Sequence, residues 1–210
     1  MSSISPRFLG LIEEEDLGDK RVLDIGCGAG RLSLVLAPRA LSVVGLDRDA
    51  GSIGEARQRA AAAGLVNVEF QEADVDSVEY SPFAPDMVVS HLFASDAMVE
   101  RAGRALGPGG CLAMVTFHVD QWRETGKVSR FAYDESRMSR VLERAGFKPE
   151  LSEMEREERR FGSSEEAAEA ARGLQDRWKA DGRWDGYIAF LQAGGRTLTR
   201  SHLIVKARKP

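Results

Sequence analysis

The sequence contains few cysteines and no long apolar segment. Only Cys27 and Cys111 occur among 210 residues, too few for a disulfide scaffold and too far apart for a zinc site. No apolar run approaches the ~20 residues that a membrane-spanning helix needs. Met1 to Gly10 lacks the basic start and apolar core of a signal peptide. We therefore expect a reduced cytoplasmic protein with no metal ligands and no membrane contact.

The sequence also lacks a strong excess of one charge. Its 29 Lys and Arg oppose 33 Asp and Glu, which gives a net charge of −4. The first 120 residues hold 10 basic and 18 acidic side chains, and the last 90 hold 19 and 15. An acidic surface binds phosphate backbones poorly, and the alternating signs of 153–160 are typical of a solvated face. A nucleic-acid partner is disfavoured.

Short apolar segments alternate with helical ones in the first 120 residues. An N-terminal helix is predicted within 1–16, and the apolar segments read as buried strands because they are nearly continuous rather than alternating. The pattern predicts a doubly wound α/β fold with a mostly parallel sheet, in a single domain over 1–210. Strands are expected at 21–25, 41–46, 66–71, 86–90 and 111–117, with helices at 31–37, 50–63 and 96–106.

The pattern changes after residue 120. A helix at 135–145 precedes a strand at 147–160, and helices at 163–179 and 184–193 precede a last strand at 198–208. Residues 161–196 are therefore predicted to be a helical insertion between the last two strands. Its aromatic residues at helical spacing, with others that follow the fifth strand, are expected to pack in a core or line a substrate pocket, which would make the insertion a lid or an interface. The candidates are Trp122, Phe131, Tyr133, Trp184, Tyr187 and Phe190.

The most informative segment is a strand that runs into a glycine loop, Val22-Leu23-Asp24-Ile25-Gly26-Cys27-Gly28-Ala29-Gly30. Glycines there allow tight dihedral angles and let a ligand approach the backbone. A dinucleotide-binding loop would have its third small residue at position 31, which is Arg31 here. Asp24 would repel a pyrophosphate and attract a cationic ligand. The loop therefore favours a cationic ligand over a dinucleotide.

Two further acids follow neighbouring strands. Asp47 ends the second strand, about 20 residues beyond the glycines, where a carboxylate accepts ribose hydroxyls. Asp74 follows the third strand, where a carboxylate can accept a hydrogen bond from an exocyclic amine, and Glu72 competes for that role. Ligands bind at the carboxyl ends of the strands in such folds. The acids are thus expected to line one crevice that binds a positively charged nucleoside.

With these residues in place, the sequence resembles class I S-adenosylmethionine-dependent methyltransferases. The resemblance covers about 17–148 and the last strand, and it is carried by four motifs in order. They are Asp24-Ile25-Gly26-Cys27-Gly28-Ala29-Gly30, Val44-Gly45-Leu46-Asp47, Ala73-Asp74-Val75 and Leu106-Gly107-Pro108-Gly109-Gly110. The family fold implies seven strands in the order 3-2-1-4-5-7-6, with the last strand antiparallel.

The resemblance also implies which residues contact S-adenosylmethionine and its product S-adenosylhomocysteine. Asp24 and Gly26 to Gly30 would hold the methionine end, with Cys27 as a small residue near the ligand. Asp47 would hold the ribose, Asp74 the adenine amine, and the backbone of Val75 the ring. Arg48 and Ser90, next to these motifs, are expected at the same site.

Methyl transfer needs alignment of the acceptor more than it needs catalytic side chains, because the sulfonium is already activated. A general base helps when the acceptor is protonated at neutral pH. His91 follows the fourth strand and His118 follows the fifth, so both are candidate bases, and a purely structural histidine is the alternative for each. His202 lies in the last strand and is expected to be structural.

The fourth strand ends in Ser90-His91-Leu92-Phe93, without the Asn/Asp-Pro-Pro-Tyr typical of family members that methylate base amines or glutamine amides. A small-molecule acceptor, methylated on O, N or C, is therefore favoured. Two alternatives stay open: an RNA or protein methyltransferase that docks through the basic C-terminal half, and a cofactor-binding module without catalysis. Monomer and homodimer are both compatible with the sequence.

Overall fold

The computed structural model describes residues 4–210, which form two compact units. The first contains the described residues up to Thr116, together with Glu135–Glu153 and Ile204–Pro210. The second contains Phe117–Asp134 and Met154–Leu203. The long strands β5, β7 and β8, whose bounds follow, contribute residues to both units, so the division does not coincide with the ends of secondary-structure elements.

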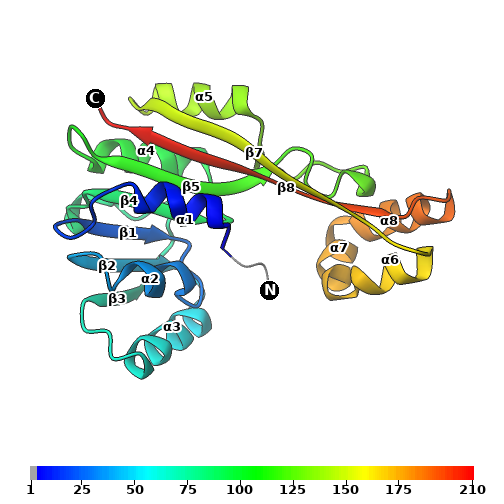
Figure 1. Cartoon of the computed structure of the whole chain (residues 1–210), viewed down its shortest axis with the longest axis horizontal. Helices are drawn as coiled ribbons and strands as arrows, with labels where there is room; N and C mark the ends of the chain where they lie inside the picture. The colour runs from blue at the N-terminus through cyan, green and yellow to red at the C-terminus, as the bar shows by residue number, and fades with distance from the viewer. Residues whose placement is uncertain (1–3) are drawn as a thin grey trace. The chain divides into compact units, whose positions relative to one another are not determined.

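The central sheet has the strand order β3-β2-β1-β4-β5-β8-β7 (Figure 1). Strands β1 to β5 pair in parallel, while β7 and β8 run antiparallel to each other. The predicted fold class and the predicted order 3-2-1-4-5-7-6 are confirmed, with the two long strands counted as sixth and seventh. The strands are β1 (Arg21–Ile25), β2 (Ser42–Asp47), β3 (Val68–Glu72), β4 (Met87–His91), β5 (Cys111–His118), β7 (Lys148–Arg160) and β8 (Thr197–Arg208).

One strand was not predicted. Ala132–Tyr133 forms β6, which pairs in parallel with the end of β5. Two residues are too few to give an apolar run that a sequence pattern can identify. The third strand begins at Val68 rather than at position 66, because Val66 is 98% exposed and precedes the pairing with β2.

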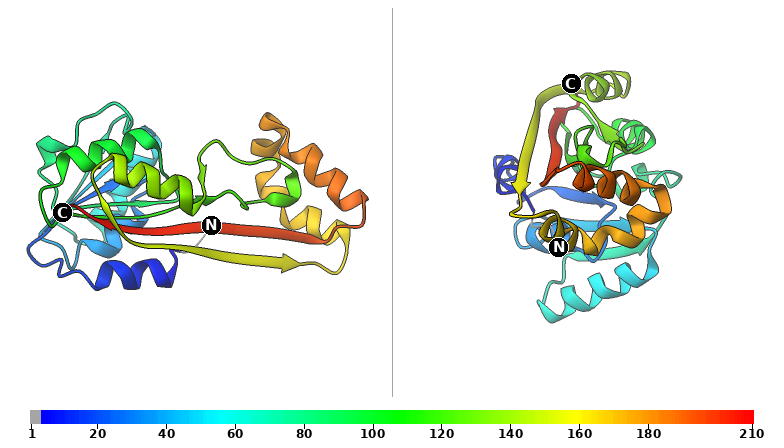
Figure 2. Two further views of the ribbon diagram at one scale, coloured as in Figure 1. Left: turned by 90° about the horizontal axis from the view of Figure 1, so that it is seen from above. Right: turned by 90° about the vertical axis from the view of Figure 1, so that its right-hand side faces the viewer.

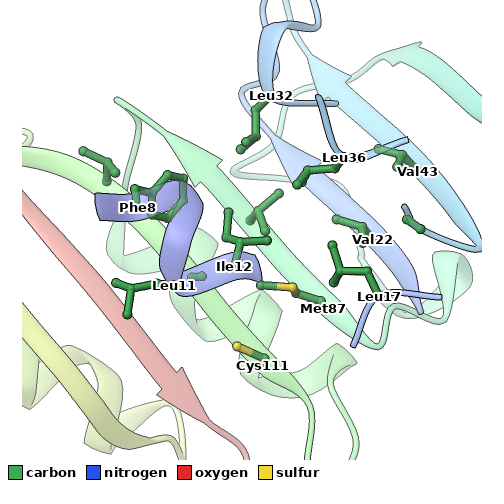
Figure 3. Packing of buried hydrophobic residues seen from close by; sticks show 14 of the residues in the cluster. Phe8, Leu11, Ile12, Leu17, Val22, Leu32, Leu36, Val43, Met87 and Cys111 are labelled. Atoms are coloured by element: carbon green, nitrogen blue, oxygen red, sulfur yellow. The ribbon is translucent and has the colours of Figure 1, made fainter. Parts of the chain in front are cut away.

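One face of the sheet in the first unit is covered by α1 (Pro6–Glu13) and α2 (Arg31–Leu36). Phe8, Leu11 and Ile12 of α1 point onto the strands, beside Leu32 and Leu36 of α2 (Figure 3). Helix α1 begins where it does because Ser5 Oγ accepts a hydrogen bond from Phe8 N and Pro6 occupies the first turn. The predicted N-terminal helix is thus present, and residues 1–3 of its predicted range lie outside the described residues.

The other helices of the first unit are α3 (Ala50–Ala62), α4 (Asp96–Ala105) and α5 (Glu135–Arg144). Figure 2 shows α4 and α5 on the opposite face of the sheet from α1. Asp49 caps α3, since its Oδ1 accepts a hydrogen bond from Ser52 N at 2.7 Å. That cap fixes the chain direction immediately after Asp47, the last residue of β2.

The second unit contains α6 (Ser164–Ala170), α7 (Gln175–Asp181) and α8 (Arg183–Gln192). The prediction of one helix over 163–179 is wrong, because a 3₁₀ turn at Arg172–Leu174 separates α6 from α7. Gly173 lies in that turn, and glycine is a poor residue in a helix interior. The predicted start is confirmed, as Ser163 Oγ accepts a hydrogen bond from Glu166 N at 3.2 Å.

The aromatic residues of the second unit form a core of their own. Trp178 and Tyr187 are fully buried, with ring centroids 5.5 Å apart. Trp122 meets Trp178 edge-on at 5.2 Å, and Trp184 lies 6.5 Å from the same ring. Edge-to-face pairs of this kind add stabilisation beyond the buried area. The aromatic spacing read from the sequence therefore produces a packed core.

No helix within residues 4–210 combines the length and the apolar character needed to cross a membrane.

A buried ion-pair network joins the end of the N-terminal helix to the last strand in the first unit. Glu15 Oε1 lies 2.8 Å from Lys206 Nζ and 2.5 Å from Arg208 Nη2, and Arg208 also binds Glu150 at 2.6 Å. The side chains of Glu15 and Lys206 are only 12% and 7% exposed. The Arg208 hydrogen bond, more than the opposing effect of burial, lowers the pKa of Glu15 to about 2.

We expect Glu15→Gln to lower the free energy of unfolding at pH 7 by about 2 kcal/mol, because Lys206 would stay buried without its closest counter-charge. The Glu15 pKa is lowered from 4.5, so its contribution is present above pH 4.5 and is lost as pH falls towards 2. The difference in the free energy of unfolding between wild type and variant should therefore shrink as the pH falls from 4.5 towards 2. Urea unfolding measured across the pH range tests this.

Glu13→Gln is the matched control. Glu13 binds Arg39 at 2.6 Å, but both side chains are about half exposed, so its loss should cost less than about 0.5 kcal/mol. Equal losses in the two variants would contradict the role given to the buried network.

Candidate functional site

The glycine loop, Gly26 to Gly30, joins the end of β1 to the start of α2. Gly26, Gly28 and Gly30 all have positive φ, at 68°, 51° and 75°, a region that favours glycine over side-chain-bearing residues. Gly26 N and Cys27 N both donate to Leu46 O, at 2.8 and 3.0 Å. The loop is thus tied by its backbone to the end of β2.

The side chain of Asp47 also binds the glycine loop. Its Oδ2 accepts a hydrogen bond from Gly28 N at 2.8 Å, and its Oδ1 accepts one from Asp49 N at 2.9 Å. A carboxylate oxygen accepts more than one hydrogen bond, so both oxygens keep capacity for ligand hydroxyls. The acid is thus held by two backbone donors in a fixed position beside the glycine loop.

Asp24 lies in β1 and is 1% exposed. Ser33 Oγ, on α2, donates a hydrogen bond to Asp24 Oδ2 at 2.6 Å. Burial raises the pKa of Asp24 to about 6, against the smaller lowering effect of the Ser33 hydrogen bonds. Ser33 was not predicted as part of the site, although its position two residues into the helix after the loop could have suggested it.

A cavity of about 450 Å³ opens beside these residues, within the size range of small-molecule and cofactor sites. Six predicted residues line it: Asp24, Gly26, Cys27, Gly28, Ala29 and His91. The lining residues that sequence reasoning missed are Arg31, Leu32, Ser52, Glu55, Arg59 and Leu92.

Arg31, Leu32 and Ser52 lie in the first turns of α2 and α3, which follow the predicted loop and Asp47, while Glu55 and Arg59 lie further along α3. The predicted start of each helix could have indicated the lining residues of its first turn. Arg59 Nη2 binds Glu55 Oε1 at 2.5 Å, so one cationic and one anionic side chain of the lining are paired with each other.

His91 and Leu92, at the end of β4, line another side of the cavity. His91 stacks on Phe8 of α1, with ring centroids 6.2 Å apart. Ser90, fully buried, donates its hydroxyl to Ile25 O and Phe93 O, at 2.8 and 2.9 Å. Leu92 has a φ of 64°, an unusual conformation for such a residue. Ser90 thus fixes the turn after β4 to the end of β1, next to the glycine loop.

The acid after β3 lies in a turn. Asp74 Oδ1 accepts a hydrogen bond from Asp76 N at 3.1 Å. Val75 is buried, and its carbonyl accepts a hydrogen bond from Tyr80 Oη at 2.6 Å. Among the residues that the structure describes, the cavity lining does not include Gly30, Asp47, Arg48, Asp74, Val75 or Ser90. Their roles in cofactor binding stay predictions.

The remaining predicted residues belong to the second unit. His118 ends β5 and is 6% exposed, and its Nδ1 accepts a hydrogen bond from Asp120 N at 3.2 Å. This hydrogen bond places the proton of the neutral ring on Nε2. Burial lowers the pKa of His202, in keeping with the structural role expected for it.

The predicted substrate residues of this unit are largely buried. Trp122 is 9%, Tyr133 1% and Tyr187 0% exposed, whereas Phe131 is 43% exposed beneath the Arg130 guanidinium. Tyr187 Oη donates to Thr197 O at 3.3 Å. These residues pack within the unit, and their contact with substrate stays a prediction, as does the lid.

With the geometry established, comparison with known proteins identifies the family. The family model described as "Methyltransferase domain" matches residues 17–167. The chain belongs to this family, and the resemblance to class I S-adenosylmethionine-dependent methyltransferases is confirmed.

Two relatives of known class share part of the sequence. The trans-aconitate 2-methyltransferase of Methylobacterium nodulans is 38% identical over 101 residues, 45% of this chain and 37% of that protein. The ubiquinone biosynthesis O-methyltransferase of Paracidovorax citrulli is 30% identical over 125 residues, 56% of this chain and 52% of that protein. The chain thus spans about half or less of the length of these relatives.

A solved structure shares the fold. Phosphoethanolamine N-methyltransferase 2 of Haemonchus contortus, in complex with S-adenosylhomocysteine, has a TM-score of 0.63 at 20% sequence identity, over 97% of this chain and 53% of that chain. At this identity the likeness concerns the fold alone. Together with the family, it supports S-adenosylmethionine as the cofactor.

The buried Asp24 predicts a specific pH dependence of cofactor binding. Because its pKa is raised from 3.8 to about 6, Asp24 is ionised at pH 7.5 and protonated at pH 5. If Asp24 attracts the ligand ammonium as predicted, that charge is lost in between, and we expect the Kd for S-adenosylhomocysteine to rise about tenfold. Isothermal titration calorimetry across this range measures the effect.

The unliganded protein should show the opposite trend. A raised carboxyl pKa means that protonation favours the folded state, so the Asp24 contribution to stability grows as pH falls through 6. Asp24→Asn should remove most of the pH dependence of binding, whereas the exposed Asp19→Asn should keep it. An unchanged pH profile in Asp24→Asn would show that another group titrates.

Proposed function

We propose that this protein is an S-adenosylmethionine-dependent methyltransferase that transfers the methyl group in line to O, N or C of a small-molecule acceptor. The observation that carries the proposal is the position of the glycine loop between two acids. Asp47 accepts a hydrogen bond from the loop backbone, and the buried Asp24 lines the same cavity as the loop. A loop of glycines beside two fixed carboxylates suits a cationic nucleoside better than a pyrophosphate.

The residues present fit this cofactor. In the proposed arrangement Asp24 and Gly26 to Gly28 bind the methionine end, Asp47 binds the ribose hydroxyls, and Asp74 with the backbone of Val75 binds the adenine. When bound, S-adenosylmethionine supplies an activated methyl group. The protein then has to exclude water and orient the acceptor, which is where binding geometry contributes most.

His91 is the better candidate for a general base. It lines the cavity and is held by Phe8, so its ring has a defined position near the bound cofactor. His118 has its Nδ1 occupied by the Asp120 backbone amide, so its neutral ring presents a donor at Nε2. We propose that His91 accepts a proton from the acceptor where the acceptor is protonated at neutral pH.

A small-molecule acceptor is supported by charge and by the relatives. The second unit holds twelve basic and twelve acidic residues, so the basic C-terminal half gives no net positive unit for a phosphate backbone. The names of the two relatives refer to trans-aconitate and to ubiquinone biosynthesis. The first name gives a small-molecule acceptor and the second the biosynthesis of a small molecule, and the acceptor of this chain is proposed to be of that class.

Methyl-labelled S-adenosylmethionine, incubated with the protein and a size-fractionated cell extract, tests the proposal. We expect label in the small-molecule fraction, which mass spectrometry would then identify. Label in RNA or protein would assign the acceptor to a macromolecule. Absence of label with intact binding of S-adenosylhomocysteine would contradict catalysis in that extract and favour a cofactor-binding module.

Asp47→Ala provides the matching binding test. The variant loses the proposed ribose acceptor and the hydrogen bond to Gly28 N, so its affinity for S-adenosylhomocysteine should fall at least tenfold, about 1.4 kcal/mol or more. Asp19→Ala, in an exposed turn, should bind like wild type. Unchanged affinity in Asp47→Ala would overturn the assigned cofactor site.

A further inference from the structure

We propose that Phe70, on the edge strand β3, is a positioning residue for the cofactor loop. Its ring packs against Gly30 of the glycine loop and against Gly45 of β2, and so limits how closely the loop can approach the sheet. This inference rests on the proposed function, because it gives the loop's position a role in cofactor binding. It concerns a residue in none of the four family motifs and outside the cavity lining.

The ring of Phe70 occupies space left by two glycines that are 15 positions apart in the sequence. A methyl group at Gly30 would lie 2.7 Å from Phe70 Cζ, and one at Gly45 would lie 2.6 Å from Phe70 Cδ1. Carbon atoms do not approach this closely without a shift. The ring therefore contacts the last glycine of the loop and the middle of β2 at once.

Phe70 belongs to a buried apolar cluster that also contacts Cys27 of the glycine loop. Phe70 is 4% exposed and packs with Ile53 and Ala56 of α3, with Cys27 at the border of the cluster. A methyl group at Gly45 would also lie 2.9 Å from Cys27 Sγ. Gly45 is thus the point where the sulfur and the ring both come close to the backbone of β2.

The backbone of Phe70 is fixed from the open edge of the sheet. Arg57 Nε and Nη2 both donate to Phe70 O, at 3.1 and 2.6 Å. Strand β3 ends the sheet order, so its outward carbonyls have no neighbouring strand. The guanidinium replaces that strand at Phe70 and holds the ring beneath the loop.

The hydrogen bonds of the loop do not substitute for the ring. Those to Leu46 O and Asp47 hold Gly26, Cys27 and Gly28, while Gly30 N bonds within the loop to Cys27 O. Gly30 packs against Phe70 and Ala56. Arg59 Nη1 also donates to Ala29 O, but at 3.5 Å, the long limit for a hydrogen bond. Removal of the ring would therefore weaken the packing at the end of the loop, where α2 starts.

The test compares removal of the ring, intrusion against it, and both together. Phe70→Ala and Gly45→Ala should each raise the Kd for S-adenosylhomocysteine at least tenfold, measured by calorimetry at a temperature where each variant is folded. The double variant Phe70→Ala with Gly45→Ala should bind no more than threefold more weakly than Phe70→Ala alone, because the ring that the added methyl group would meet is gone and only Cys27 Sγ remains close to it. Gly54→Ala, where a methyl group meets no atom within 4 Å, should bind like wild type.

Leu142→Ala separates positioning from loss of stability. Leu142 is fully buried on α5, so its truncation should lower the melting temperature without affecting cofactor affinity. Equal weakening of binding in Leu142→Ala and Phe70→Ala would overturn the proposal, as would a loss of affinity in the double variant equal to the sum of the two single losses.

The reactivity of Cys27 gives a readout that needs no cofactor. In a Cys111→Ala background, the rate of Cys27 modification by an aromatic disulfide reagent should rise at least fivefold in Phe70→Ala and stay at the wild-type value in Leu142→Ala. Lack of S-adenosylhomocysteine binding in wild type would contradict the proposed function alone. An unchanged Cys27 rate in Phe70→Ala would contradict the role of Phe70 alone.

Discussion

The attachment of the glycine loop to the end of β2 is the constraint on which the rest of the site depends. Leu46 O accepts two loop amides and the Asp47 carboxylate accepts a third. These bonds need β2 to lie beside β1 with Leu46 paired to Ile25, so the parallel register positions the loop. Because register in a buried sheet is fixed by which side chains face the core, the hydrophobic core determines the site geometry indirectly.

The site keeps a buried acid with a raised pKa in its interior. Asp24 is almost fully buried, and one serine hydroxyl is its hydrogen-bond donor. Burial of a charge is unfavourable unless partners compensate, and here compensation is incomplete because the pKa rises. A cationic ligand would supply the missing charge. If Asp24 binds the cofactor as proposed, the unfavourable burial in the free protein is offset on binding, which is a form of preorganisation.

The sequence allowed the fold and the centre of the site to be predicted, because both depend on local patterns. The apolar runs gave the strands, and the loop with Asp24 and His91 gave part of the cavity lining. Ser33, Ser52 and Glu55 were missed because helix periodicity places them there only after the helices are docked on the sheet. The break at Gly173 was missed because the capping signals at Ser163 were strong and one glycine is tolerated in many helices. The two-residue strand β6 carries no pattern at all.

The contribution of Phe70 shows why glycine patterns are hard to interpret from sequence alone. Gly30 has a positive φ, so its type follows from the backbone. Gly45 lies in a regular strand, where glycine is normally unfavourable, and the reason for it is the ring of a residue 25 positions later. A strand glycine beside a cofactor loop therefore indicates a large side chain on the neighbouring strand. In the proposed role, Phe70 belongs to the site because its ring limits the positions that the glycine loop can adopt.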